Sequence, residues 1–88
     1  MPKVNASASL TASAAVGLNN AVYHGYTVTV VTATAAIYIR NGSGGQIIDV
    51  IPIGTAAGAT KSLNGGIALS ALYVDFNGGT GTLVIHHT

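Results

Sequence analysis

Apolar and polar residues alternate along most of this chain of 88 residues, and the alternation has the period of two that is typical of β-strands. The run from residue 22 to 31 is rich in Val, Thr and Tyr, and single threonines separate Tyr26, Val28 and Val30. No stretch has the apolar stripe of an amphipathic helix. The pattern therefore predicts an all-β chain.

Three Asn-Gly dipeptides divide the apolar runs, and this dipeptide is a strong signal for a hairpin turn because both residues accept positive φ. They are Asn41-Gly42, Asn64-Gly65 and Asn77-Gly78. We predict one hairpin from strands over residues 36–41 and 46–53, and another from strands over 70–76 and 82–87. The middle dipeptide is expected to end a short strand and begin the next.

About seven or eight short strands are expected, with turns roughly every 8–13 residues, which is typical of a sandwich or jelly roll. The chain is long enough for one domain, so we predict a single small antiparallel β-sandwich or jelly-roll-like barrel. Pro52 interrupts an apolar run and places that strand at a sheet edge or a bulge. Asp49 in the same run indicates an edge position or a carboxylate that accepts hydrogen bonds from loop N–H groups. The predicted core consists of Val28, Val30, Ile37, Ile39, Ile47, Ile51, Leu72, Val74, Leu83 and Ile85.

The first segment alternates for longer than a small sandwich requires. Val4, Leu10 and Val16 share one parity with several alanines, while Ser, Thr and Asn occupy much of the other. Kept straight, this strand would span ~43 Å, against ~17–20 Å for a typical strand. Residues 2–16 are therefore expected to bend between two sheets of their own fold, to form an arm on a neighbouring subunit, or to fray.

Charge is scarce, because three Lys and Arg and two Asp and Glu make up 6% of the residues, against roughly 25% in an ordinary domain. Three separated cations cannot follow a phosphate backbone, which argues against nucleic acid. Polar residues interrupt every apolar stretch before the ~18–20 residues that cross a membrane. Lys3 is not followed by the apolar core of a signal peptide, so we expect synthesis in a cytoplasm.

A surface of neutral polar residues suits permanent contact with other protein molecules. A small chain without cysteine is also expected to gain stability by association. We therefore predict a homo-oligomer, with a trimer favoured.

Catalytic and metal signatures are missing from the sequence. Asp49 and Asp75 are the whole acidic inventory, and a glycosidase needs two carboxyl groups in one cleft. His86 and His87 are consecutive and point to opposite faces of a strand, and a zinc site built with His24 would still need further ligands. We expect no catalytic, cofactor or metal site.

Two predicted strands carry an ion pair beside tyrosines. Arg40 shares a parity with Tyr38, and Asp75 shares one with Tyr73, so neighbouring strands could place the charges together. Such a group is either a solvated ion pair worth ~0–1 kcal/mol or part of a contact patch for a partner. The candidate partner-contact residues are Val4, Leu10, Val16, Tyr38, Arg40, Tyr73 and Asp75.

The tyrosines also suggest a different ligand. Tyr23, Tyr26, Tyr38 and Tyr73 could form a platform on which sugars stack, although tyrosine is equally favoured in strands for packing and at protein interfaces. A carbohydrate-binding module is therefore an alternative function.

Residues 36–42 and 46–51, followed by residues 66–69 and 72–75, resemble the small β-rich structural proteins of tailed bacteriophages, including head decoration, cement and fibre-associated proteins. The resemblance covers about residues 22–86. It implies a virion protein, made in the host cytoplasm, that joins a capsid in many copies and bridges capsomers without a cofactor or catalysis. A trimer would match a capsid's threefold positions. A tail, fibre or adaptor component is the alternative within the virion.

Overall fold

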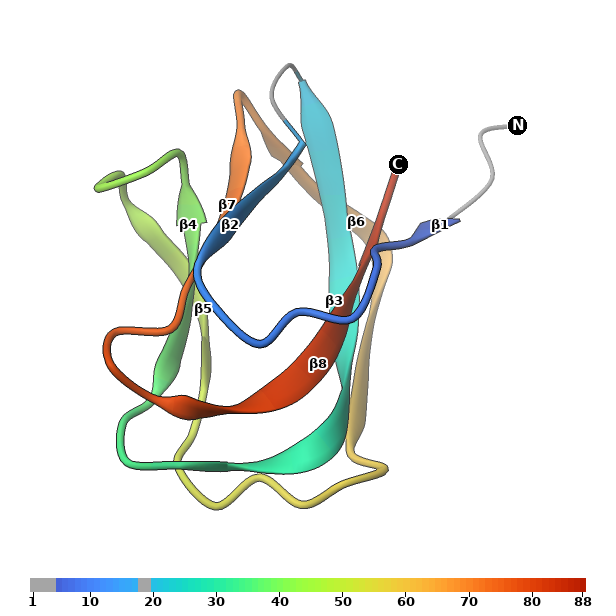
Figure 1. The fold of residues 1–88 in the computed structure, drawn as a ribbon. Helices are drawn as coiled ribbons and strands as arrows, with labels where there is room; N and C mark the ends of the chain where they lie inside the picture. The colour runs from blue at the N-terminus through green and yellow to red at the C-terminus, as the bar shows by residue number, and fades with distance from the viewer. Residues whose placement is uncertain (1–4, 18–19) are drawn as a thin grey trace.

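The computed structural model describes residues 5–17 and 20–88, which form two four-stranded antiparallel sheets facing each other (Figure 1). The first, called here the β3 sheet, has the spatial order β1 (Asn5–Ala6), β8 (Thr80–His87), β3 (Ala21–Ala33) and β6 (Thr60–Leu69). The second, the β4 sheet, has the order β2 (Ala14–Gly17), β7 (Leu72–Asp75), β4 (Ile37–Asn41) and β5 (Ile47–Ile51). The predicted all-β sandwich is confirmed. No helix capable of spanning a membrane occurs in the part of the chain that the structure describes.

The long strand β3 changes its inward parity at Gly25. Its pairing with both β6 and β8 shifts between Tyr23 and Gly25, and Gly25 has a φ of 126° that only glycine adopts without strain. A Cβ on this residue would lie 1.9 Å from the carbonyl oxygen of Lys61. On a regular strand, residues three positions apart point to opposite faces. Because of this bulge, Tyr23 and Tyr26 instead both point into the core.

The core lies between the two sheets and contains eight of the ten residues predicted for it. Val30 and Ile47 are the two wrong assignments, because they are 51% and 42% exposed. Register shifts beside each residue turn it to the outer face: β3 shifts against β8 between Val28 and Val30, and β5 shifts so that Ile47 lies opposite Arg40. The core also includes residues that were not predicted, namely Ala21, Tyr23, Tyr26, Leu69 and Phe76.

Only one of the two predicted hairpins is present. Strands β4 and β5 pair around Asn41-Gly42, and β5 is an edge strand, as predicted. It ends at Ile51, just before Pro52, whereas the predicted strand continued to residue 53. The second hairpin is wrong, because β7 and β8 belong to different sheets and the turn at Asn77-Gly78 carries the chain from one sheet to the other. Asn64-Gly65 does not end a strand either, since it lies within β6.

The described part of the N-terminal segment, residues 5–17, runs from one sheet to the other (Figure 1). β1 pairs with β8, Leu10 forms an isolated bridge with Leu83, and β2 pairs with β7. Leu10 and Val16 pack against the core of their own domain. The segment thus bends between sheets, and it forms the last strand at one edge of each sheet.

Candidate interaction surfaces

Four of the predicted contact residues come together on the outer face of the β4 sheet. Tyr38 lies opposite Asp75 and Arg40 lies opposite Tyr73 in the pairing of β4 with β7. The residues between them on these strands point into the core, so these four side chains face outward. Period-two alternation was enough to predict this grouping.

The predicted ion pair between Arg40 and Asp75 is present, with 2.9 Å between Nε and Oδ2. Arg40 Nη1 donates a hydrogen bond of 2.8 Å to the carbonyl oxygen of Gly45, and Asp75 Oδ1 accepts one of 2.9 Å from the backbone N–H of Asn77. The guanidinium carbon lies 5.4 Å from the centre of the Tyr38 ring, within cation–π range. Both charges are therefore neutralised and fixed in place.

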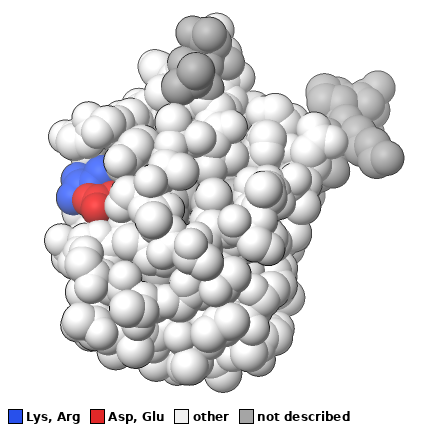
Figure 2. Space-filling model, in the orientation of Figure 1, with Lys and Arg blue, Asp and Glu red and all other residues white. Residues whose placement is uncertain are grey.

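Apolar side chains extend the same face toward the edge strand β5. Val50 lies opposite Tyr38, and Ile47 lies opposite Arg40, and they are 41% and 42% exposed. On the other side, Ala15 of β2 lies opposite Tyr73. We call this surface the Tyr38 face, and it consists of Ala15, Tyr38, Arg40, Ile47, Val50, Tyr73 and Asp75. In the view of Figure 2, charged side chains occupy one small patch of an otherwise uncharged surface.

The other predicted contact residues are not part of the Tyr38 face. Leu10 and Val16 are partly buried against the core, which leaves them less surface for a partner. Val4 lies outside the described residues.

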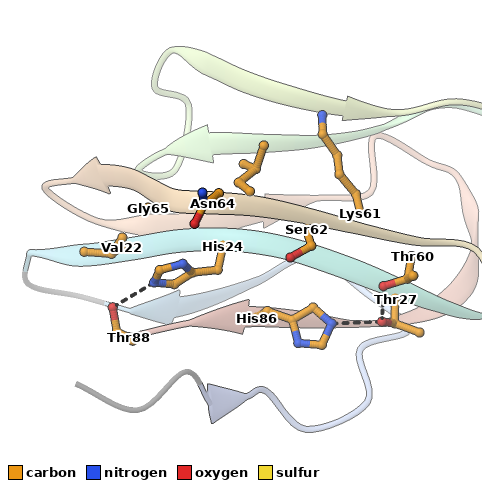
Figure 3. Close-up of a pocket in the computed structure, with 11 residues that line it drawn as sticks. Val22, His24, Thr27, Thr60, Lys61, Ser62, Asn64, Gly65, His86 and Thr88 are labelled. Carbon is orange, nitrogen blue, oxygen red and sulfur yellow. Dashed lines mark hydrogen bonds between the residues drawn. The ribbon is translucent and has the colours of Figure 1, made fainter. Parts of the chain in front are cut away.

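A groove lies on the outer face of the β3 sheet, and the sequence did not predict it (Figure 3). Its volume is about 850 Å³. Strands β3, β6 and β8 all contribute to it, and the residues that line it are Val22, His24, Thr27, Thr60, Lys61, Ser62, Leu63, Asn64, Gly65, His86 and Thr88. Seven of these eleven residues carry a hydroxyl, amide or imidazole group.

Irregular pairing of β6 with β3 shapes one wall of this groove. Ser62 pairs with Gly25 and Ile67 pairs with Tyr23, so residues 63–66 of β6 face only His24 of β3. The extra residues bulge outward, and Gly66 adopts a φ of 72°. A Cβ on Gly66 would lie 2.9 Å from the His24 ring, so the bulged segment lies close against the imidazole.

Hydrogen bonds between side chains hold the polar groups of the groove. His86 Nε2 lies 2.8 Å from Thr27 Oγ1, which in turn lies 2.9 Å from Thr60 Oγ1. Further along β3, His24 Nε2 lies 3.2 Å from Oγ1 of Thr88, the residue that follows β8. Figure 3 shows these two hydrogen-bonded groups at separate positions along the groove.

A second ion pair lies beside the groove and joins the two sheets. Asp49 of β5 contacts Lys61 Nζ of β6 through both carboxylate oxygens, at 2.9 and 3.0 Å, and Oδ2 also accepts a hydrogen bond of 2.8 Å from the Tyr23 hydroxyl. The edge position expected for Asp49 is confirmed. Burial, followed by the hydrogen bond to Asp49, raises the pKa of Tyr23 well above its usual value.

The arrangement limits the chemistry of the protein. Within residues 5–17 and 20–88 no cluster of three or more His, Cys, Asp and Glu side chains could hold a metal ion. The predicted platform of four tyrosines is wrong, because Tyr23 and Tyr26 are buried in the core. Comparison of the chain with protein-family models, with curated proteins and with solved structures found no match. The two outer faces of the sandwich are therefore the candidate functional surfaces.

Proposed function

We propose that this chain is a virion structural protein, a capsid decoration or cement protein that binds another virion protein through the Tyr38 face. The observation that supports this proposal most directly is the grouping of Tyr38, Tyr73, Ile47 and Val50 around a self-neutralised ion pair on one exposed sheet face. The resemblance of residues 22–86 to phage structural proteins supplies the class of partner.

The composition of the Tyr38 face matches that of protein interfaces. The cores of protein interfaces are enriched in Tyr and Arg and depleted of Lys, Glu and Asp. Tyr and Arg side chains also supply much of the binding energy. Arg40 and Asp75 stay paired when a partner covers them, so neither is left as a lone buried charge. Each Å² of apolar surface that Ile47 and Val50 bury would contribute about 25 cal/mol.

Association also fits the size and charge of the chain. A domain of this length buries only ~60–65% of the surface of its unfolded form, and the chain has no cysteine with which to form a disulfide. Contact with a capsid, or with copies of itself, would add buried surface. We propose a homo-oligomer and favour a trimer, which would place three Tyr38 faces around a threefold axis of a capsid.

Quantitative mass spectrometry of purified virions tests the proposal. A decoration protein should be present at a copy number comparable with that of the major capsid protein. A copy number far below that would indicate a tail, fibre or adaptor component, and absence from the particle would refute the virion function altogether.

A binding assay tests the role of the Tyr38 face. Tyr38→Ala and Tyr73→Ala should each weaken binding of the purified protein to undecorated capsids at least about tenfold, the equivalent of 1.4 kcal/mol. His86→Ala, on the opposite sheet, is the matched control and should bind like the unmodified protein. Equal binding by all three variants would show that the protein uses another surface.

A further inference from the structure

We propose that the groove on the outer face of the β3 sheet binds a neutral carbohydrate, held by His24, Thr27, Thr60, Asn64, His86 and Thr88. This inference does not depend on the virion function, because the groove and the Tyr38 face lie on opposite outer faces of the sandwich. It also differs from the tyrosine platform, since none of the four tyrosines lines the groove.

The chemistry of the lining is complementary to sugar hydroxyl groups. Threonine hydroxyls and neutral imidazoles can both donate and accept hydrogen bonds, and an asparagine amide offers donors and acceptors together. Thr60, Thr27 and His86 form one hydrogen-bonded row, and His24 with Thr88 forms a second group. These bonds hold the side chains in defined orientations. Thr60 Oγ1 also donates a hydrogen bond of 3.1 Å to the carbonyl oxygen of Tyr26, so Thr27 donates to Thr60, and each of these two hydroxyls keeps one acceptor position for a ligand.

The charge of the groove favours a neutral ligand. Among the lining residues that the structure describes, Lys61 alone is charged, and both carboxylate oxygens of Asp49 contact its ammonium group. An anionic ligand would therefore have to compete with Asp49 for the ammonium. A neutral polar ligand has no such competition and can use the hydroxyl and imidazole groups directly.

The shape of the groove suits a short oligosaccharide rather than an added peptide strand. Its volume of about 850 Å³ lies within the ~300–1,000 Å³ of small-molecule sites. The groove lies on a sheet face, where β3 is already paired on both sides with β6 and β8, so a peptide in it could not add to the ladder of β3. Val22 supplies apolar contact for the C–H face of a sugar ring, whereas the side chain of Leu63 packs against the core.

The groove is built on rigid elements. The polar side chains stand on three paired strands, and the segment 63–66 leaves no room for a Cβ at Gly66 beside His24. Sites built on strands hold their groups more accurately than sites on loops. Ligand binding should therefore need little rearrangement of the protein.

A glycan array tests the proposal. The labelled full-length protein is applied to printed neutral, sialylated and sulfated oligosaccharides, and the strongest neutral hit is titrated by isothermal calorimetry. We expect neutral glycans to bind, and we expect that a sialyl or sulfate group does not raise the affinity of a glycan. His86→Ala and Thr60→Val should each lower the affinity at least about fivefold, whereas Tyr73→Ala, on the Tyr38 face, should leave it unchanged.

Several results would overturn the proposal. These are no binding of any neutral glycan at millimolar concentration, a preference for sialylated or sulfated glycans, and unchanged affinity in both groove variants. A dimer that His86→Ala dissociates, without glycan binding, would show that a second copy occupies the groove. If a variant does not fold, NMR of the unmodified protein with the neutral hit decides: shifts must fall on Thr27, Thr60 and His86 rather than on Tyr38 and Tyr73.

Discussion

Asp49 shows how the surroundings of a single residue determine how much an ion pair contributes to the stability of the fold. The Asp49–Lys61 and Arg40–Asp75 pairs have the same N–O distance of 2.9 Å. Asp49, however, joins the two sheets and also accepts the hydroxyl hydrogen bond of the buried Tyr23. Arg40 and Asp75 lie on the outer face of a single sheet. The two acidic residues should therefore contribute differently to stability.

Replacing each acidic residue by alanine measures this difference. Asp49→Ala leaves the Tyr23 hydroxyl buried without its partner, so it should lower the free energy of unfolding by about 2–3 kcal/mol. Because Lys61 is 41% exposed, water can still solvate the ammonium group, and the loss should not reach the value for a fully buried pair. Asp75→Ala should cost about 1 kcal/mol. Urea denaturation compares the two, and equal costs would contradict the role of Asp49.

Tyr23 should make the protein sensitive to alkali. Its pKa is raised in the folded state by burial and by Asp49, so above about pH 10 the unfolded chain loses a proton that the folded chain keeps. The stability that depends on Tyr23 is complete below its ordinary pKa and falls as the pH rises above it, by up to about 1.4 kcal/mol per pH unit. Tyr23→Phe should reduce this slope in denaturation curves from pH 9 to 11. An unchanged slope would show that Tyr23 is not the group that makes the protein sensitive to alkali.

At the scale of elements, the sequence predicted where strands lie better than which strands pair with each other. Period two identified β4 and β7 and suggested that neighbouring strands could place Arg40 against Asp75, while β5 was recognised as an apolar run beside a turn signal. The turn at Asn77-Gly78 was also recognised, since Asn77 and Gly78 both have positive φ. A turn signal is local, however, and does not say whether the next strand pairs with the last one or crosses to the other sheet.

The groove could not be predicted because it depends on irregular pairing. The bulge at Gly25 reverses the parity of β3, and the extra residues 63–66 of β6 leave His24 with no direct partner. A constant period of two along β3 places His24 on the inner face with Val28 and Val30, so it separates His24 from Thr27 instead of bringing both to the groove. Glycine and Asn-Gly within strand-like runs were the available signals, because interior glycines often mark bulges.

Two glycine variants test the importance of the β3 bulge. Gly25→Ala places a Cβ against the backbone of Lys61 at a φ unsuited to L-residues, so it should lower the free energy of unfolding by about 3 kcal/mol or more. Gly44 also has positive φ but has open space around it, so Gly44→Ala should cost only about 1–2 kcal/mol. Thermal denaturation compares them, and a mild effect of Gly25→Ala would show that β3 can adopt another register.

For the whole molecule, the two outer faces offer different chemistry to different ligands. The Tyr38 face is aromatic and apolar around a closed ion pair, whereas the groove presents hydroxyl and imidazole groups. Because the core separates them, a protein bound to the Tyr38 face would leave the groove open. Virion attachment and carbohydrate binding are therefore compatible in one small domain.

The N-terminal segment should be needed for the stability of the whole sandwich. Leu10 and Leu83 exchange two backbone hydrogen bonds of 2.8 and 3.1 Å, and the hydroxyls of Ser7 and Ser13 accept bonds of 2.9 Å from the N–H groups of Ile85 and Phe76. Deleting residues 2–14 would remove these partners and expose the edge of β8.

We therefore expect the deletion of residues 2–14 to lower the melting temperature sharply and to cause aggregation that increases with concentration, as free strand edges do. Leu10→Ala, which keeps the backbone bonds, should cause a smaller loss and no new aggregation. Circular dichroism melts and sedimentation velocity measure both effects. If the shortened chain melted at the unchanged temperature but no longer bound capsids, the segment would act as a contact arm, and its packing within the sandwich would matter little for folding.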